Sequence, residues 1–186
     1  MIIIGLTGEN GSGKGTFVDY LRKKGFQALS LSDVLREELA AEGKEITREN
    51  LMAKGNELRK RFGPAILAKR TLPKVRGDSD CVIDSIRNPA EVEELRKLKG
   101  FLLVRMVAKS EVRFERVKKR ARESDPQTLE AFKKVGAAEA AHPDATRQQL
   151  VATAKLADRI MRNDDGLQDL HGKIDALLAE LEGGRA

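Results

Sequence analysis

The chain has 186 residues, of which 40% are hydrophobic and 34% charged, and its formal net charge is +6. One cysteine, Cys81, excludes an intramolecular disulfide framework and a Cys-rich zinc site, and no apolar run approaches the ~20 residues that span a bilayer. We therefore expect one compact soluble domain, a cytoplasmic location and no membrane partner.

Apolar, β-branched runs alternate with longer charged segments of helical period, which is the pattern of an α/β fold with a parallel sheet. In chain order, the predicted strands are residues 2–7, 26–31, 81–84, 101–107 and 158–162. The predicted helices are residues 14–24, 33–41, 47–62, 65–72, 88–99 and 110–123, one from Gln127, and 167–181. Residues 136–145 are rich in small side chains and contain His142-Pro143, which predicts a loop or hinge.

The segment Gly8-Glu9-Asn10-Gly11-Ser12-Gly13-Lys14 fits the pattern G-x-x-x-x-G-K, directly after an apolar strand and before an amphipathic helix. Glycines let the backbone N–H groups of such a loop turn toward phosphate oxygens, and the helix adds its positive N-terminal end. A glycine-rich turn without a ligand is the alternative. The predicted nucleotide-binding residues are Gly8, Asn10, Gly11, Ser12, Gly13, Lys14, Gly15 and Thr16, and Lys14 would reach the terminal phosphates.

The loop departs from the common pattern at Gly15, where a Ser or Thr hydroxyl normally binds Mg²⁺. We therefore expect phosphates and waters to hold Mg²⁺, with Asp84 helping through a water molecule and Thr16 as a weaker candidate ligand. Asp84 ends an apolar predicted strand, so capping of the next helix is the alternative role.

The stretch from Gly8 to Thr16 resembles the loop of adenylate kinase and of the wider nucleoside monophosphate kinase family. Residues 31–36, after the second predicted strand, and 84–87, after the third, also resemble stretches of that family. Residues 4–8, 83–87 and 157–163 also resemble dephospho-CoA kinase and the archaeal-type kinases related to it.

The resemblance implies a P-loop NTPase three-layer sandwich whose five-stranded parallel sheet has the order 2-3-1-4-5. Residues 1–186 would form a single kinase domain, with a core of 1–40, 76–114 and 150–186. A helical acceptor-binding insert would span about 41–75, and a lid-like insert about 115–149.

Four arginines fit phosphoryl transfer, because a guanidinium binds phosphate in a bidentate way and stays charged. Arg36 and Arg87 follow the carboxyl ends of predicted strands, where open α/β sheets bind ligands, and the resemblance implies that they hold the acceptor phosphate. Arg116 and Arg120 lie four residues apart on one helix face, and they match the lid arginines that clamp donor phosphates and neutralise the transferring group. Solvated helix faces also accommodate such arginines. Asn163 resembles the turn that borders the donor base, although it also suits an ordinary turn.

Asp33 bears on the choice between the two enzymes. In dephospho-CoA kinase the matching aspartate accepts a proton from a ribose hydroxyl, whereas an acceptor phosphate is already ionised and needs no base. Adenylate kinases also carry an aspartate there, and helix capping is a further role for it. Gly15 favours the monophosphate kinase, because dephospho-CoA kinases resemble the common pattern with Ser after the lysine.

The sequence therefore predicts a kinase that transfers phosphate from ATP, with Mg²⁺, to a nucleoside or deoxynucleoside monophosphate. Dephospho-CoA kinase is the alternative, and a nucleotide-dependent switch or nucleic-acid-binding NTPase is the third. A net charge of +6 permits nucleic-acid binding, but with no Trp, one Tyr and six Phe the chain has few side chains on which bases stack. The expected partner is a small-molecule nucleotide acceptor, and the expected assembly is a monomer or homodimer.

Overall fold

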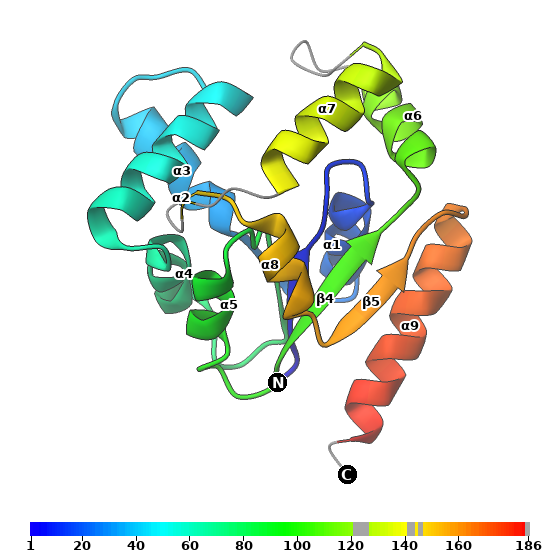
Figure 1. The fold of residues 1–186 in the computed structure, drawn as a ribbon. Helices are drawn as coiled ribbons and strands as arrows, with labels where there is room; N and C mark the ends of the chain where they lie inside the picture. The colour runs from blue at the N-terminus through cyan, green and yellow to red at the C-terminus, as the bar shows by residue number, and fades with distance from the viewer. Residues whose placement is uncertain (121–126, 141–143, 145–146, 185–186) are drawn as a thin grey trace.

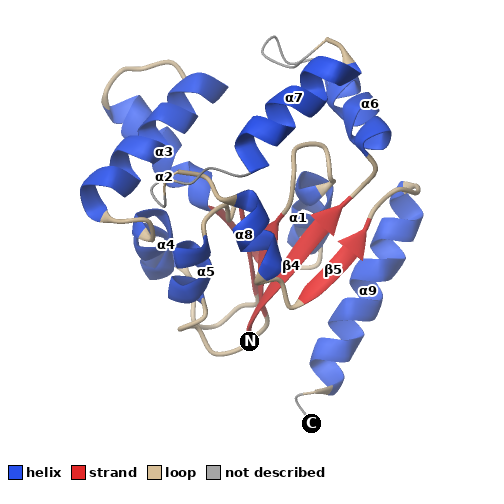
Figure 2. Cartoon of the chain, in the orientation of Figure 1, coloured by secondary structure: helices blue, strands red, loops and turns tan. Residues whose placement is uncertain are grey.

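The structure is a computed structural model that describes residues 1–120, 127–140, 144 and 147–184. Within these residues, five parallel strands form one sheet in the order β2-β3-β1-β4-β5, with helices packed on both faces (Figure 1, Figure 2). The strands are β1 Ile3–Thr7, β2 Gln27–Ser30, β3 Cys81–Asp84, β4 Phe101–Val107 and β5 Arg159–Arg162. The predicted α/β class and strand order are confirmed.

The helices alternate with these strands. They are α1 Lys14–Lys23, α2 Leu31–Ala41, α3 Arg48–Phe62, α4 Ile66–Thr71, α5 Pro89–Leu95, α6 Ser110–Arg120, α7 Leu129–Ala140, α8 Leu150–Lys155 and α9 Leu167–Gly183, with a short 3-10 helix, η1, at Leu72–Lys74. In Figure 1, α3 and α7 stand on opposite sides of the end of the sheet toward which β4 points. Across the described ranges, none of the helices is both long and apolar enough to cross a membrane.

β1 lies at the centre of the sheet, where Ile3 pairs in register with Cys81 of β3 and with Phe101 of β4. Successive side chains of a strand point to opposite faces. Accordingly, Ile4 and Leu6 pack in the core beneath α1 and α9, whereas Ile3 packs in the core shared with α2 to α5. Every residue of β1 is buried, which explains why the strand reads as a continuous apolar run.

The junction between β2 and α2 lies earlier than predicted. β2 ends at Ser30 and α2 begins at Leu31, so the predicted strand 26–31 was too long. Leu31, Val34 and Leu35 are all buried against the same core, and this i, i+3, i+4 spacing starts the helical period at Leu31. Asp33 therefore lies within the first turn of α2. The alternative interpretation of Asp33 as the capping residue of this helix is wrong, because Ser30 occupies the N-cap position.

The predicted loop or hinge at 136–145 was wrong in its first part, because α7 continues through Gly136 to Ala140. Residues 141–143 and 145 lie outside the described residues, as do 121–123 at the end of the predicted helix 110–123. The helix predicted at 88–99 ends at Leu95, where a turn takes the chain into β4.

α8 was not predicted, because six residues are too few for a helical period to stand out.

Candidate functional site

The glycine-rich segment at residues 8–16 comprises a loop, residues 8–13, between β1 and α1, and the first residues of α1, at the carboxyl end of the central strand. Gly8 and Gly13 have φ angles of 137° and 99°, which glycine adopts without steric cost. A Cβ on Gly8 would collide with the carbonyl oxygen of Met106, and one on Gly13 with Nδ2 of Asn163. The loop thus has the strand, the backbone turns and the following helix that bind phosphate in other proteins.

Lys14 folds back over this loop. Its Nζ donates hydrogen bonds to the carbonyl oxygens of Gly8 at 2.7 Å and Glu9 at 3.0 Å. Burial lowers the pKa of Lys14 to about 8; the Asp84 carboxylate opposes this shift, and the charge of Arg87 adds to it. An anion bound beside this ammonium would therefore stabilise its charged form.

Asp84 ends β3 next to the loop, and its oxygens differ in their surroundings. Oδ1 is buried without a hydrogen-bond partner in the described part of the chain, whereas Oδ2 accepts a long hydrogen bond of 3.4 Å from the hydroxyl of Ser85. A free carboxylate oxygen fits a hydrated divalent cation. Gly15 offers no hydroxyl, and Thr16 is exposed on α1, so the residues fit Mg²⁺ held chiefly by phosphate and water.

An open cleft of about 1560 Å³ lies over the carboxyl end of the sheet and brings most of the predicted site together. Gly8 and Ser12 do not line it; both are buried, and the Ser12 hydroxyl has no partner among the described residues. The predicted site residues that line the cleft are Asn10, Gly11, Gly13, Lys14, Gly15, Thr16, Asp33, Arg36, Asp84, Arg87, Arg116, Arg120 and Asn163.

In α2, which follows β2 directly, Arg36 donates hydrogen bonds to the Ser32 hydroxyl at 2.8 Å and to the Asp33 carboxylate at 3.0 Å. The hydroxyls of Ser30 and Ser32 lie 2.8 Å apart, and that of Ser30 donates to Ser85 at 3.1 Å. These serines line the same cleft. Sequence reasoning assigned them no role, because Ser30 at the end of β2 and Ser85 after β3 meet only when the two strands pair.

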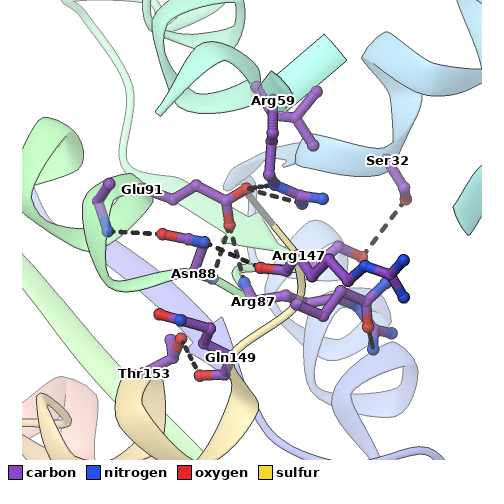
Figure 3. Close-up of polar contacts among 12 residues, drawn as sticks. Ser32, Arg59, Arg87, Asn88, Glu91, Arg147, Gln149 and Thr153 are labelled. Carbon is purple, nitrogen blue, oxygen red and sulfur yellow. Dashed lines mark hydrogen bonds and ion pairs between the residues drawn. The ribbon is translucent and has the colours of Figure 1, made fainter. Parts of the chain in front are cut away.

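Arg87 follows β3 and is held by both its backbone and its side chain. Its N–H donates to Oε2 of Glu91 at 2.8 Å, and Nη1 donates to Oε1 of Gln148 at 3.2 Å. Arg59 of α3 pairs with the same Glu91 carboxylate, and Asn88 donates from its amide to the carbonyl oxygen of Arg147 (Figure 3). Sequence reasoning missed Arg59, Glu91 and Gln148. The Asn88-Pro89 helix start, with Glu at the third helical position, was the signal that could have revealed Glu91.

On the other side of the loop, α6 carries Arg116, which contacts the turn after β5, and Arg120, which contacts the loop. Arg116 donates to the backbone carbonyl of Asn163 at 2.8 Å and to that of Asp165 at 3.1 Å. Arg120 donates to the side-chain oxygen of Asn10 at 3.4 Å. Asn163, itself buried, donates through Nδ2 to the carbonyl oxygen of Ser12 at 2.9 Å and so joins the turn after β5 to the phosphate loop.

Arg113 is a further α6 residue at this loop, which sequence reasoning missed. Its guanidinium pairs with Glu9 at 3.1 Å, donates to the carbonyl oxygen of Asn10 at 3.3 Å and lies over the ring of Phe132. The side chain is buried, unlike an ordinary solvated arginine. Its place three residues before Arg116, on the same helix face, was the available signal.

The chain is similar in sequence to known proteins. The family model described as an AAA domain matches residues 4–134. A UPF0200 protein of Sulfurisphaera tokodaii is 32% identical over 179 residues, which cover 96% of this chain and 97% of the relative. A UPF0200 protein of Pyrococcus horikoshii is 31% identical over 191 residues, which cover 97% of each chain.

Among solved structures, a shikimate kinase from Acinetobacter baumannii is similar in fold. It has a TM-score of 0.59 and 15% identity, and the match covers 97% of this chain and 94% of that one. The likeness shows the fold, which is that of the P-loop kinases. The chain therefore contains an AAA domain with a P-loop kinase fold and belongs to the UPF0200 protein family.

Proposed function

We propose that the protein is a kinase that transfers the γ-phosphate of ATP, with Mg²⁺, to a nucleoside or deoxynucleoside monophosphate. The observation that carries the proposal is the position of Arg87. Its guanidinium lines the cleft with a neutral partner, Gln148, and its charge is close enough to Lys14 to lower the pKa of that lysine. Two cations of this kind suit two phosphorylated substrates that meet between them.

On the donor side, the loop N–H groups and Lys14 would bind the phosphates of ATP. Asp84 would hold Mg²⁺ through water, and the bound ion would neutralise charge on the phosphates. Arg116 and Arg120 would clamp the donor phosphates from α6, and loss of either arginine would raise the barrier to transfer by roughly 3 kcal/mol. Asn163 would border the donor nucleotide while it holds the loop.

On the acceptor side, Arg36 and Arg87 would hold the acceptor phosphate at the carboxyl ends of β2 and β3. Because that phosphate is already ionised, transfer needs orientation and charge neutralisation more than a base. We propose that the segment 41–75 binds the acceptor and that the segment 115–149 closes over the site, which excludes water before transfer.

The test measures ADP formation from ATP and Mg²⁺ with AMP, GMP, CMP, UMP, dTMP or dephospho-CoA as acceptor. Turnover that depends on a monophosphate is expected, and the Lys14→Ala variant provides the blank. Hydrolysis of ATP at the same rate without any acceptor would contradict the proposal and favour a switch or nucleic-acid-binding NTPase. Salt-sensitive RNA or DNA binding would support that third function.

Dephospho-CoA kinase is a second candidate, which the surroundings of Asp33 favour. Its carboxylate lines the cleft, does not cap α2 and has Arg36 as an ion-pair partner. A carboxylate in this position could accept a proton from an acceptor hydroxyl. This candidate predicts turnover with dephospho-CoA alone and loss of that turnover in Asp33→Asn. The monophosphate kinase predicts that Asp33→Asn retains most of its activity.

A further inference from the structure

Glu91, in the first turn of α5, uses both carboxylate oxygens to join two parts of the cleft (Figure 3). Oε1 accepts hydrogen bonds from Nε and Nη2 of Arg59, at 3.1 and 2.9 Å. Oε2 accepts hydrogen bonds from the backbone N–H groups of Arg87 and Asn88, at 2.8 and 3.0 Å. Arg59 belongs to α3, whereas Arg87 follows β3. A single carboxylate therefore sets the spacing between the Arg59 guanidinium and the Arg87 backbone.

The burial of this pair makes a purely stabilising role a weak explanation for it. Arg59 is 2% exposed and Glu91 is 0% exposed. Removing both charges from water costs several kcal/mol, and well-packed apolar side chains often serve stability as well or better. Capping of α5 does not require the charge either, because Gln serves the same position of a capping box. The negative charge of Glu91 instead balances the positive charge of the buried Arg59 side chain.

Arg59 still has donors available to a ligand. Its Nη1 has no hydrogen-bond partner in the described part of the chain, and its side chain lines the cleft. Gly55, one turn earlier in α3, leaves room for this nitrogen, since a Cβ there would lie 3.1 Å from Nη1. Arg87 lines the same cleft. One carboxylate thus holds the Arg59 guanidinium and the Arg87 backbone, and the guanidinium groups of both arginines line the cleft.

We propose that Glu91 is a positioning residue for the acceptor. It holds Arg59 and the backbone of Arg87 at one spacing, so that the two guanidinium groups bind the anionic group of the acceptor, a phosphate monoester, together. The proposal rests on the proposed function and adds Arg59 to the residues that bind the acceptor. Glu91 itself does not touch the acceptor; it acts through the two arginines.

The test begins with Glu91→Gln, which keeps the side-chain size and the capping box but removes the charge and one acceptor oxygen. The acceptor is the monophosphate with the highest turnover in the panel above. We expect the KM for this acceptor to rise about tenfold, the scale of one lost hydrogen bond to a charged group, while the KM for ATP stays within about twofold. Glu93→Gln, the same change at an exposed position of α5, is the matched control and leaves both KM values unchanged.

A second variant separates positioning from stability. Glu91→Gln leaves Arg59 buried without its counter-charge, so its thermal midpoint should fall. The double variant Arg59→Met/Glu91→Gln removes both charges and should regain the midpoint. We expect its acceptor KM to stay raised, because the guanidinium donors of Arg59 are absent. If Glu91→Gln does not fold, this double variant carries the test.

Three results would overturn the positioning role: an acceptor KM in Glu91→Gln equal to that of the control, an equal rise in the KM values for ATP and acceptor, or a double variant that regains both the midpoint and the acceptor KM. A wild-type protein that turns over no monophosphate would instead overturn the proposed function. The first three results leave the proposed function standing, so the two failures are distinguishable.

Discussion

Nη2 of Arg113 lies 3.1 Å from Oε1 of Glu9, and this ion pair ties α6 to the phosphate loop. Nη1 of the same guanidinium donates to the carbonyl oxygen of Asn10. The side chain of Arg113 is buried, whereas that of Glu9 is 41% exposed, so this ion pair is shielded from water on the Arg113 side only. The helix that carries the proposed donor arginines is thereby held in register with the loop that would bind the donor.

We predict that Arg113→Met raises the KM for ATP about tenfold, because the loop loses two contacts that hold Glu9 and Asn10. The KM for the acceptor should change less than about twofold. Steady-state kinetics with each substrate varied in turn provide the measurement. Lys118→Met, at an exposed position of the same helix, is the control, and an ATP KM in Arg113→Met equal to that of this control would contradict the prediction.

Gly15 is the position where a metal-binding hydroxyl can be restored. A Cβ there would meet no atom within 4 Å, and the backbone lies outside the left-handed region. We predict that Gly15→Ser folds with an unchanged or slightly higher thermal midpoint, since Ser exceeds Gly in helix propensity by roughly 0.5 kcal/mol. The Mg²⁺ concentration that gives half-maximal activity should fall several-fold in a metal titration.

Gly13→Ser is the matched contrast to this variant. Gly13 has a φ of 99°, which strains any residue with a side chain, and a Cβ there would collide with Nδ2 of Asn163. Nucleotide binding should therefore be lost in this variant. A Gly15→Ser variant with an unchanged Mg²⁺ requirement would show that the hydroxyl does not reach the ion.

The lowered pKa of Lys14 predicts a pH dependence of stability. Burial lowers this pKa from 10.5 to about 8 in the folded protein. Between these two values the unfolded chain keeps a proton that the folded chain has lost, so the contribution of Lys14 to the free energy of unfolding rises with pH across this window. Denaturant titrations of wild-type and Lys14→Met protein at pH 7 and pH 9.5 would measure it. The free energy of unfolding of the wild type, relative to that of Lys14→Met, should be larger at pH 9.5 than at pH 7.

From the lowered pKa of the Lys14 amine we also predict that the protein takes up a proton when it binds a nucleotide. Bound phosphates favour the protonated amine, so ATP should raise the Lys14 pKa, and the complex should take up a proton near pH 8.5. Calorimetry in buffers of different ionisation enthalpy measures this uptake. Equal uptake by wild-type and Lys14→Met protein would assign the proton to another group.

Ser85 has a strained backbone and also lines the cleft. Its effect on stability and its effect on activity can be measured separately. It has a φ of 66°, which costs a residue with a side chain about 1 kcal/mol. Ser85→Gly should relieve this strain and raise the thermal midpoint, but it removes the hydroxyl that meets Ser30, so kcat/KM for the acceptor should fall. Ser85→Ala keeps the strain and should lose activity with no gain in stability. A Ser85→Gly variant that is less stable than Ser85→Ala would refute the strain argument.

The amino-acid sequence by itself determined the α/β class and the phosphate loop with its lysine. These features depend on neighbours along the chain: an apolar run for β1, glycines at fixed spacing, Lys14, and an amphipathic period for α1. The positions of Arg36 and Arg87 in the cleft also followed, because parallel strands place their carboxyl ends at one edge of the sheet. Boundaries were less well predicted where a helix is short, as at α8, or follows a strand without a break, as at Ser30 and Leu31.

The tertiary structure alone decided the contacts that hold these residues. Arg59 and Glu91 are 32 positions apart, and Asn163 and Ser12 are 151 apart. No local period marks such pairs, because each member is an ordinary polar residue of its own helix or turn until the sheet brings the segments together. The burial that gives the Arg59–Glu91 pair its energetic importance, and that lowers the Lys14 pKa, arises from packing between segments distant in the chain.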